Sequence, residues 1–171
     1  MTAIENLYSR RSVRKYKSQQ ITDEELQQVL KAGIYAPTGM NLQSPIIVAV
    51  QNKEEIAALS KMNASFWTAK VDPFYGAPTV LVVLGERDSR FAVQDGSLVM
   101  GNLMNAAHAV GLGSCWINRA REVFDSDEGK ALLEKWGVEG DYVGVGNCIL
   151  GYADEEPAPK PRKDNYVYFV K

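Results

Sequence analysis

The clearest chemistry in the sequence lies in a short basic run near its start. The run Arg10-Arg11-Ser12-Val13-Arg14 places three arginines and one serine within five residues. Guanidinium groups match the geometry of phosphate with paired hydrogen bonds, and a serine hydroxyl adds a further donor. If the run is extended, Arg10, Ser12 and Arg14 share one face. The run therefore predicts an anion site, and the alternative is a solvated basic stretch.

A second basic group lies near the other end of the chain. Lys160-Pro161-Arg162-Lys163 is held by prolines that restrict the backbone and reduce the entropy lost on binding. On its own, this group is typical of a charged tail. If it converges with the first basic run, the two would form one strong anion site, and the sequence does not show that convergence.

A polar segment, Pro37-Thr38-Gly39-Met40-Asn41-Leu42-Gln43, runs between a predicted helix and a predicted strand. Gly39 permits a close approach of the backbone to a ligand. Asn41 and Gln43 each carry an amide that donates and accepts, which suits a ring with alternating carbonyls and nitrogens. The alternative is an ordinary connecting loop.

A glycine-rich segment, Gly111-Leu112-Gly113-Ser114-Cys115-Trp116-Ile117, follows the longest predicted helix. Its glycines end that helix and allow tight backbone packing. It is neither the G-x-G-x-x-G dinucleotide fingerprint nor a P-loop. Nothing beside Cys115 would lower its pKa, so we interpret it as a packed small residue rather than a nucleophile.

Composition limits the classes of function. The 171 residues are 46% hydrophobic and 23% charged, which predicts one globular domain over residues 1–171 rather than a disordered or disulfide-stapled chain. A net charge of −2 indicates neither nucleic acid nor membrane as a partner. One histidine and two separated cysteines, Cys115 and Cys148, do not suggest a metal site. Reduced thiols and the absence of an apolar signal core in Met1–Arg14 favour the cytoplasm.

The elements that must position these segments follow from capping and periodicity. Capping boxes at Thr2 and Thr22 predict two early helices, the second ending before Pro37. The sequence also predicts helices over 54–61, 91–110 and 127–136, and strands over 46–50, 80–84, 114–118, 144–151 and 166–170. Interleaved helices and strands predict an α+β or α/β class.

The helix over 91–110 is apolar on nearly every side. A domain of this size has little core with which to surround such a helix, so a second subunit would supply the missing cover. The pattern therefore predicts a homodimer.

The four segments, in their order along the chain (10–14, 36–45, 111–117 and 160–162), resemble the FMN-dependent nitroreductase family. The resemblance implies an α+β fold with a mixed, mainly antiparallel sheet flanked by helices, in an intertwined homodimer with FMN at the interface. The last strand would reach the partner's sheet. The basic residues would hold the FMN phosphate and ribityl chain, Arg14 would lie at the pyrimidine edge, and the polar loop, from the other subunit, and the glycine-rich segment would line the ring. The implied cofactor residues are Arg10, Arg11, Ser12, Arg14, Pro37, Thr38, Gly39, Asn41, Gln43, Gly113, Ser114, Cys115, Trp116, Lys160 and Arg162.

The resemblance also implies an activity. NADH or NADPH would pass a hydride to flavin N5, and a small oxidant such as a nitroaromatic or a quinone would then take the electrons in a ping-pong cycle, with no catalytic side chain required. Met40, Phe74 and Tyr75 are the expected substrate contacts. The alternatives are a flavin enzyme of the same fold with another reaction (desaturation, dehalogenation or flavin breakdown), a non-enzymatic FMN-binding module, and a phosphate-ligand binder without flavin.

Overall fold

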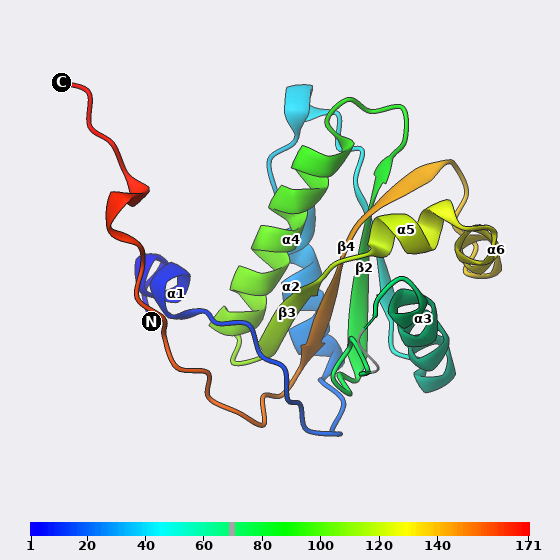
Figure 1. Cartoon of the computed structure of the whole chain (residues 1–171), viewed down its shortest axis with the longest axis horizontal. Coiled ribbons are helices and arrows are strands. Elements are labelled where there is room, and N and C mark those ends of the chain that lie inside the picture. Colours follow the sequence, from blue (N-terminus) through cyan, green and yellow to red (C-terminus); the bar gives the residue numbers. More distant parts are fainter. Residues whose placement is uncertain (69–70) are drawn as a thin grey trace.

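The computed structural model describes residues 1–68 and 71–171, and one antiparallel sheet lies at its centre (Figure 1). The strands are β1 (Ile46–Val50), β2 (Thr79–Glu86), β3 (Gly113–Ile117) and β4 (Tyr142–Gly151), in the order β1-β2-β4-β3. Each neighbouring pair is antiparallel, and the pairing of β2 with β4 shifts register between Val83 and Leu84. One isolated parallel bridge, between Ser12 and Ser114, makes the pairing mixed rather than purely antiparallel. These features confirm the predicted α+β class.

Helices cover both faces of the sheet (Figure 1). On one face lie α2 (Asp23–Ile34) and α4 (Ala92–Ala109), and on the other lie α3 (Lys53–Ser65), α5 (Ala120–Asp125) and α6 (Asp127–Lys135). The short helix α1 (Ala3–Ser9) sits beside the C-terminal end of α4, where the Asn6 amide donates to the Asn105 carbonyl at 2.9 Å. The sheet is therefore buried on both sides, which explains why β2 reads as a continuous apolar run.

Both predicted capping boxes are present. At α2, the Thr22 hydroxyl accepts from the Glu25 amide at 3.2 Å, while the Glu25 carboxylate accepts from the Thr22 amide at 2.8 Å. The same reciprocal pair forms between Thr2 and Glu5 at α1. Each pair satisfies two amides that the first helical turn leaves free, so these helices begin where the sequence predicts.

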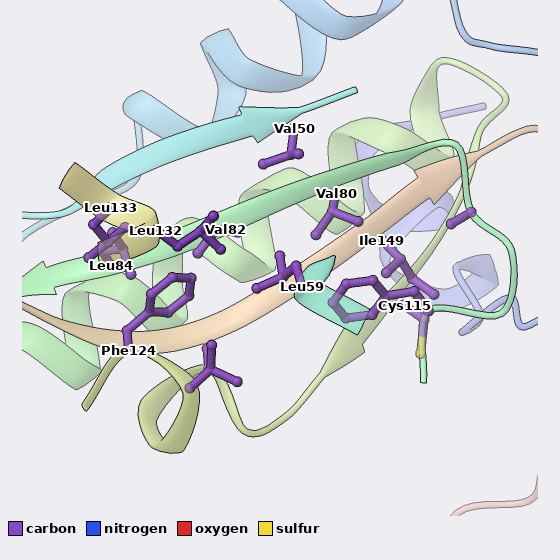
Figure 2. Close-up of a cluster of buried hydrophobic side chains, with 14 residues drawn as sticks. Val50, Leu59, Val80, Val82, Leu84, Cys115, Phe124, Leu132, Leu133 and Ile149 are labelled. Atoms are coloured by element: carbon purple, nitrogen blue, oxygen red, sulfur yellow. The ribbon is translucent and has the colours of Figure 1, made fainter. Parts of the chain in front are cut away.

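Each layer has its own apolar cluster. Figure 2 shows the cluster between the sheet and α3, α5 and α6, where Leu59 and Phe124 are packed with Val80, Val82 and Ile149 of the strands. The backbone of β4 approaches α5 so closely that a Cβ at Gly144 would lie 2.1 Å from the Ala120 carbonyl oxygen. This contact requires glycine and fixes the start of α5 against the sheet.

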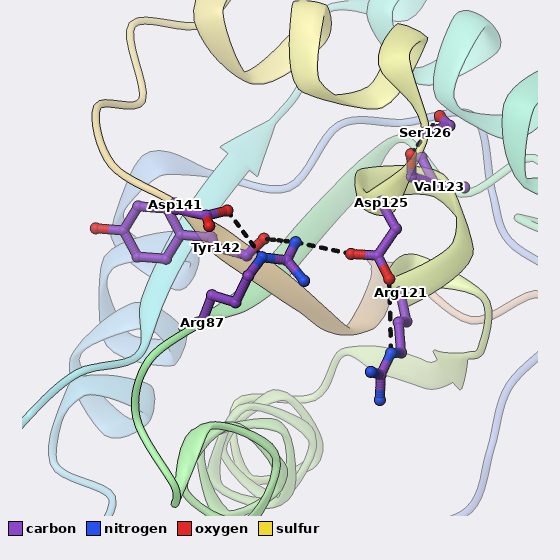
Figure 3. Close-up of polar contacts among 7 residues, drawn as sticks. All are labelled: Arg87, Arg121, Val123, Asp125, Ser126, Asp141 and Tyr142. Carbon is purple, nitrogen blue, oxygen red and sulfur yellow. Dashed lines mark hydrogen bonds and ion pairs between the residues drawn. The ribbon is translucent and has the colours of Figure 1, made fainter.

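An ion-pair network ties the end of β2 to α5 and the start of β4 (Figure 3). The Arg87 guanidinium donates to Asp141 at 2.9 Å, to Asp125 at 2.7 Å and to the Tyr142 carbonyl at 2.9 Å. Arg121 pairs with the same Asp125 at 3.6 Å. Two carboxylates of this region are therefore already paired with two of its arginines.

Three sequence-based expectations about the elements were incomplete or wrong. Helix α5 was not predicted, and α3 extends to Ser65 rather than Lys61. The strand predicted over 166–170 is absent from the described chain. Tyr166 ends a short 3₁₀ turn (Asp164–Tyr166), and residues 166–170 are 63% to 100% exposed. A strand needs a hydrogen-bonded neighbour, and this tail leaves the sheet before reaching one. None of the described helices has the length and apolar character needed to cross a membrane.

Candidate functional site

The basic run is held against the edge of the sheet by its one apolar residue. Val13 is buried, its amide donates to the Ser114 carbonyl at 3.0 Å, and a Cβ on Gly113 would lie 3.0 Å from its side chain. The Tyr16 hydroxyl donates to the Val13 carbonyl at 2.7 Å, which fixes the far end of the run. Val13 therefore anchors the run along β3 and brings its polar neighbours to that strand.

Two arginines of this run carry buried nitrogen atoms that lack a partner. Within residues 1–68 and 71–171, Arg10 Nη1 and Arg11 Nε are buried and make no hydrogen bond. The other contacts of Arg11 are to carbonyls, those of Tyr8 at 2.6 Å and Arg10 at 2.8 Å. A buried donor nitrogen without a hydrogen-bond partner is costly, and a bound anion would remove that cost. The two nitrogen atoms are thus free to donate, and the anion site that the basic run indicates stays a prediction.

A hollow of about 410 Å³ opens beside Arg11. Arg11, Gly113 and Ser114 line it, and the C-terminal tail contributes two acids and two prolines: Glu155, Glu156, Pro157 and Pro159. The tail is held there because the Asp154 amide donates to the Lys15 carbonyl at 2.9 Å and the Arg14 amide donates to the Glu155 carboxylate. Lys160 and Arg162 follow immediately and are exposed, so their convergence on the anion site stays a prediction.

His108, at the end of α4, lines the same hollow. Its Nε2 lies 2.7 Å from the Ser9 hydroxyl. Burial lowers the pKa of His108 below its usual 6.5, and the nearby positive charges of Arg10 and Arg11 lower it further. Protonation of His108 is therefore disfavoured, because it would add a third positive charge beside Arg10 and Arg11.

This arrangement predicts a specific dependence of stability on pH. Because the unfolded chain binds the His108 proton at about 6.5 and the folded chain only at lower pH, folding stability should fall as pH drops below 6.5. Urea unfolding of His108→Gln, followed between pH 7.5 and 5, should show a smaller loss than the unmodified chain. Equal losses in the two proteins would contradict a depressed pKa.

A second pocket, of about 240 Å³, lies at the other end of β3. It brings together four predicted site residues, Arg14, Tyr75, Cys115 and Trp116, with six that were not in the predicted set: Asn63, Trp67, Pro73, Ile117, Asn118 and Arg119. Its deep end is formed by Asn63, 1% exposed, and Cys115, 2% exposed. The Asn63 amide donates to the Asn118 carbonyl at 2.8 Å, which fixes α3 against the segment after β3. The pocket therefore combines amides, aromatic rings and cationic groups.

The sequence could have indicated some of these additional residues. Asn63 is a polar residue at a buried position of an amphipathic helix, which is a signal for a satisfied or ligand-binding amide. Arg119 and Asn118 carry no such signal, because their place depends on how β3 connects to α5. Trp67 lies in the same aromatic-rich stretch, 66–78, as Tyr75, which the sequence predicts as a substrate contact.

The structure corrects the role of one predicted residue, Phe74, and gives the orientation of another, Trp116, which stays in the lining of the pocket. Phe74 is 1% exposed and belongs to the apolar core, so its predicted role as a substrate contact is corrected. The indole of Trp116 packs against Gly146, where a Cβ would lie 2.8 Å from its Cε2. The ring of Trp116 therefore turns toward the α4 side of the sheet, in the cluster that α2 and α4 cover. The neighbouring Cys115 points to the opposite cluster.

The polar loop 37–43 lies at the opposite end of α4 from the basic run (Figure 1). The Gly39 amide donates to Asp95 in the first turn of α4, at 2.9 Å, whereas His108 beside the basic run lies in its last turn. A helix of 18 residues spans about 27 Å. Within one chain, the structure therefore does not bring Asn41 and Gln43 to the arginines.

The loop is nonetheless shaped in an unusual way. Met40, Asn41 and Gln43 all have positive φ, between 53° and 57°, a conformation that L-residues adopt at a cost. Gly39 lies so close to Phe91 that a Cβ would fall 2.5 Å from its ring. The side chains of Met40, Asn41 and Gln43 are exposed. A strained loop that presents polar groups outward suggests a contact beyond this chain.

An apolar surface connects these two ends. On α4, Val93 and Leu98 are 49% and 47% exposed, and a Cβ on Gly101 would meet no described atom within 4 Å. A groove of about 520 Å³ runs beside it, lined by α1, the end of α2 and α4. Exposed apolar side chains of neighbouring segments continue this surface: Ile4, Leu7, Tyr8, Ile34, Tyr35, Met40 and Leu42. The predicted full burial of α4 is thus not reached within one chain.

Comparisons with known sequences give one family. The model of the Nitroreductase family matches residues 7–152. A protein of Archaeoglobus fulgidus, named "Putative NADH dehydrogenase/NAD(P)H nitroreductase", is 33% identical over 94% of this chain and 87% of its own length. The NADPH-flavin oxidoreductase of Vibrio harveyi is 30% identical over 96% of this chain and 71% of its own length.

Solved structures agree with this result. A nitroreductase from Bacteroides fragilis, solved with bound FMN, has a TM-score of 0.92 and 28% identity, and the match covers 100% of both chains. An iodotyrosine deiodinase, 20% identical with a TM-score of 0.79, shares the fold. The basic run, the glycine-rich segment at β3 and all residues that line the 240 Å³ pocket lie within residues 7–152, which the family model matches. The chain belongs to the nitroreductase family.

Proposed function

We propose that the chain binds FMN between two subunits and uses it to transfer electrons from NADH or NADPH to a small oxidant. The observation that carries the proposal is the pair of buried, unpartnered guanidinium nitrogens at Arg10 and Arg11, which β3 connects to a pocket with amide and aromatic walls. A phosphate joined to a flat polar ring fits this pair of sites. The bound FMN of the Bacteroides fragilis relative and the flavin activity in the name of the Vibrio harveyi relative support it.

One group of residues of this chain would hold the phosphate of FMN, and another group would contact its ring. Arg10, Arg11 and Ser12 would hold the phosphate, joined by Lys160 and Arg162 once the tail closes over the hollow. Gly113, Ser114 and Cys115 would line the ring along β3, and Arg14 and Asn63 would meet its pyrimidine edge. Asn63 is an addition to the expected set, supported by its burial at the deep end of the pocket.

The polar loop would complete the site from a second copy of the chain. Pro37, Thr38, Gly39, Asn41 and Gln43 lie about one length of α4 away from the arginines of their own chain. A two-fold dimer through the apolar surface of α4 would cover that surface and place the loop of each copy at the arginines of the other. The exposed apolar tail, 166–170, would pack on the partner in the same assembly. Met40 would then approach the substrate from the partner.

The proposed reaction needs no nucleophile from the protein. FMN, when bound, accepts two electrons from a reduced nicotinamide and gives them to the oxidant in a second step, and nitroaromatics and quinones are the proposed oxidants. The protein's part is electrostatic: the fixed positive charge of Arg14 would stabilise the negative charge that reduction adds to the pyrimidine edge. Burial raises the pKa of Cys148 to about 12, so this thiol stays protonated and inert, and Cys115 is a buried free thiol packed in the apolar cluster. Two unpaired buried thiols also support a cytoplasmic location.

An anaerobic absorbance titration tests the proposal. The purified protein is expected to be yellow, to bleach with NADH or NADPH, and to recover its colour when a nitroaromatic or a quinone is added. A colourless protein that takes up no added FMN would overturn the flavin assignment. A yellow protein that neither NADH nor NADPH bleaches would overturn the assignment of a reduced nicotinamide as the electron donor. A protein that bleaches but then reduces neither oxidant would indicate another flavin reaction on this fold.

A further inference from the structure

Arg119 holds a costly backbone conformation at the wall of the 240 Å³ pocket. Its φ of 73° and ψ of 11° place it in the left-handed region, which non-glycine residues rarely adopt. It stands between β3 and α5, and the close contact of Gly144 with Ala120 fixes the next residue against the sheet. Strained residues of this kind persist where the surroundings hold them in place, and they cluster at ligand sites.

The guanidinium of Arg119 is without a counter-charge. It stacks over the ring of Trp67, 5.9 Å from the ring centroid, and forms no ion pair with any residue of 1–68 or 71–171. Arg87 and Arg121, by contrast, share Asp125, and Arg87 also pairs with Asp141 (Figure 3). Of these three arginines, Arg119 is the one that lines the 240 Å³ pocket.

The rest of the lining favours a flat, negatively charged molecule. The charged residues of the lining are Arg14 and Arg119, with no Asp or Glu among them. Trp67 and Tyr75 add aromatic walls, and Trp67, 38% exposed, marks the open end, whereas Asn63 marks the deep end. Because Arg14 and Asn63 are assigned to the cofactor, the positive charge of Arg119 is left for the second ligand. An arginine that stacks on an aromatic ring offers its planar fork to a carboxylate.

We propose that Arg119 makes this pocket selective for flat oxidants that carry a carboxylate or a comparable anionic group. The inference rests on the proposed function and names the substrate class of that site. For a nitroaromatic acid, the first two-electron step is Ar–NO₂ + NAD(P)H + H⁺ giving Ar–N=O + NAD(P)⁺ + H₂O. One nitrogen–oxygen bond breaks, and its oxygen leaves as water. The anionic group of the oxidant, at the far end of the ring, would pair with Arg119.

A matched pair of oxidants tests this selectivity. 4-Nitrobenzoate and 4-nitrobenzamide have nearly the same size and shape and differ in charge. We expect the unmodified enzyme, loaded with FMN, to show a kcat/KM for the acid at least about tenfold above that for the amide, a size consistent with one charge-assisted contact. Arg119→Gln should bring the ratio close to one. Arg121→Gln, which changes a paired arginine two positions away, should leave the ratio as it was.

A binding measurement separates selectivity from effects on the flavin. Isothermal titration calorimetry of the oxidised, FMN-loaded enzyme should show that benzoate binds more tightly than benzamide. Arg119→Gln should remove this difference in affinity. If Arg119→Gln leaves the ratio of acid to amide unchanged, both in kcat/KM and in affinity, the inference is overturned. The proposed function still stands in that case if the protein is yellow and NAD(P)H reduces it. A variant that changes only the KM for NAD(P)H would also overturn it, because Arg119 would then serve the donor. A protein that binds no FMN overturns both.

Discussion

Replacing Arg10 by alanine is expected to weaken FMN binding by about tenfold to a hundredfold. A hydrogen bond between charged groups contributes about 1.5–3 kcal/mol, and Arg10 Nη1 is a buried donor with no partner among the described residues. Titrating the flavin-free protein with FMN, followed by quenching of flavin fluorescence, gives the dissociation constant directly. Arg162→Ala should weaken binding in the same direction, because the tail beside the hollow would bring this residue to the phosphate.

The fold itself should not suffer from the Arg10→Ala change. The flavin-free chain already bears the cost of a buried, unpaired guanidinium nitrogen, so its removal should leave the free energy of unfolding equal or higher. Lys130→Ala, at an exposed position of α6, is the matched loss of a positive charge away from the site. An FMN affinity that both Arg10→Ala and Arg162→Ala leave unchanged would contradict the phosphate assignment.

The Gly101→Glu change is expected to separate the proposed dimer into monomers and to abolish FMN binding along with it. Gly101 lies on the outward face of α4, where an added side chain meets no described atom of its own chain within 4 Å. The chain should therefore fold, whereas a charge buried in a subunit contact without a partner costs several kcal/mol. Analytical ultracentrifugation, with FMN titration of the same samples, measures both consequences.

Two control variants distinguish a lost interface from a misfolded chain. Ala58→Glu places the same charge on an exposed position of α3, on the other face of the sheet, and should leave the dimer intact. Circular dichroism should show unchanged helix content in Gly101→Glu. A Gly101→Glu protein that remains dimeric and binds FMN would show that α4 is not at the interface.

The sequence predicts best the elements that carry two independent signals. Helix α2 has a capping box at Thr22 and an apolar face at helical spacing, and it begins where both indicate. Strand β2 is short, continuous and apolar, as a strand covered on both faces must be. Helix α5 was missed because six residues are too few to show a helical period, and Arg119 before it is not a capping residue.

The sequence also predicts some parts of the candidate site and not others. The segments that contribute to it are local in sequence, so their residue types alone indicate an anion and a polar ring. The pocket wall depends on contacts between distant residues, such as Asn63 with Asn118 and Trp67 with Arg119, that no local pattern encodes. Apolarity in the tail over 166–170 indicates that these side chains need cover, but it does not say which surface supplies it. For this reason the single chain shows no strand over 166–170, and the pairing of this segment with the partner's sheet stays a prediction.

We expect each FMN site to be built from the arginines of one copy of the chain and the polar loop of another. Differently tagged chains test it most directly, one carrying Arg10→Ala with Arg11→Ala and the other Asn41→Ala with Gln43→Ala. Each variant alone should bind FMN weakly, because both of its sites are damaged. The mixed dimer, purified through both tags, should have one site with both defects and one with none, and should bind one FMN with the affinity of the unmodified protein. A mixed dimer that binds as weakly as either parent would contradict the shared site.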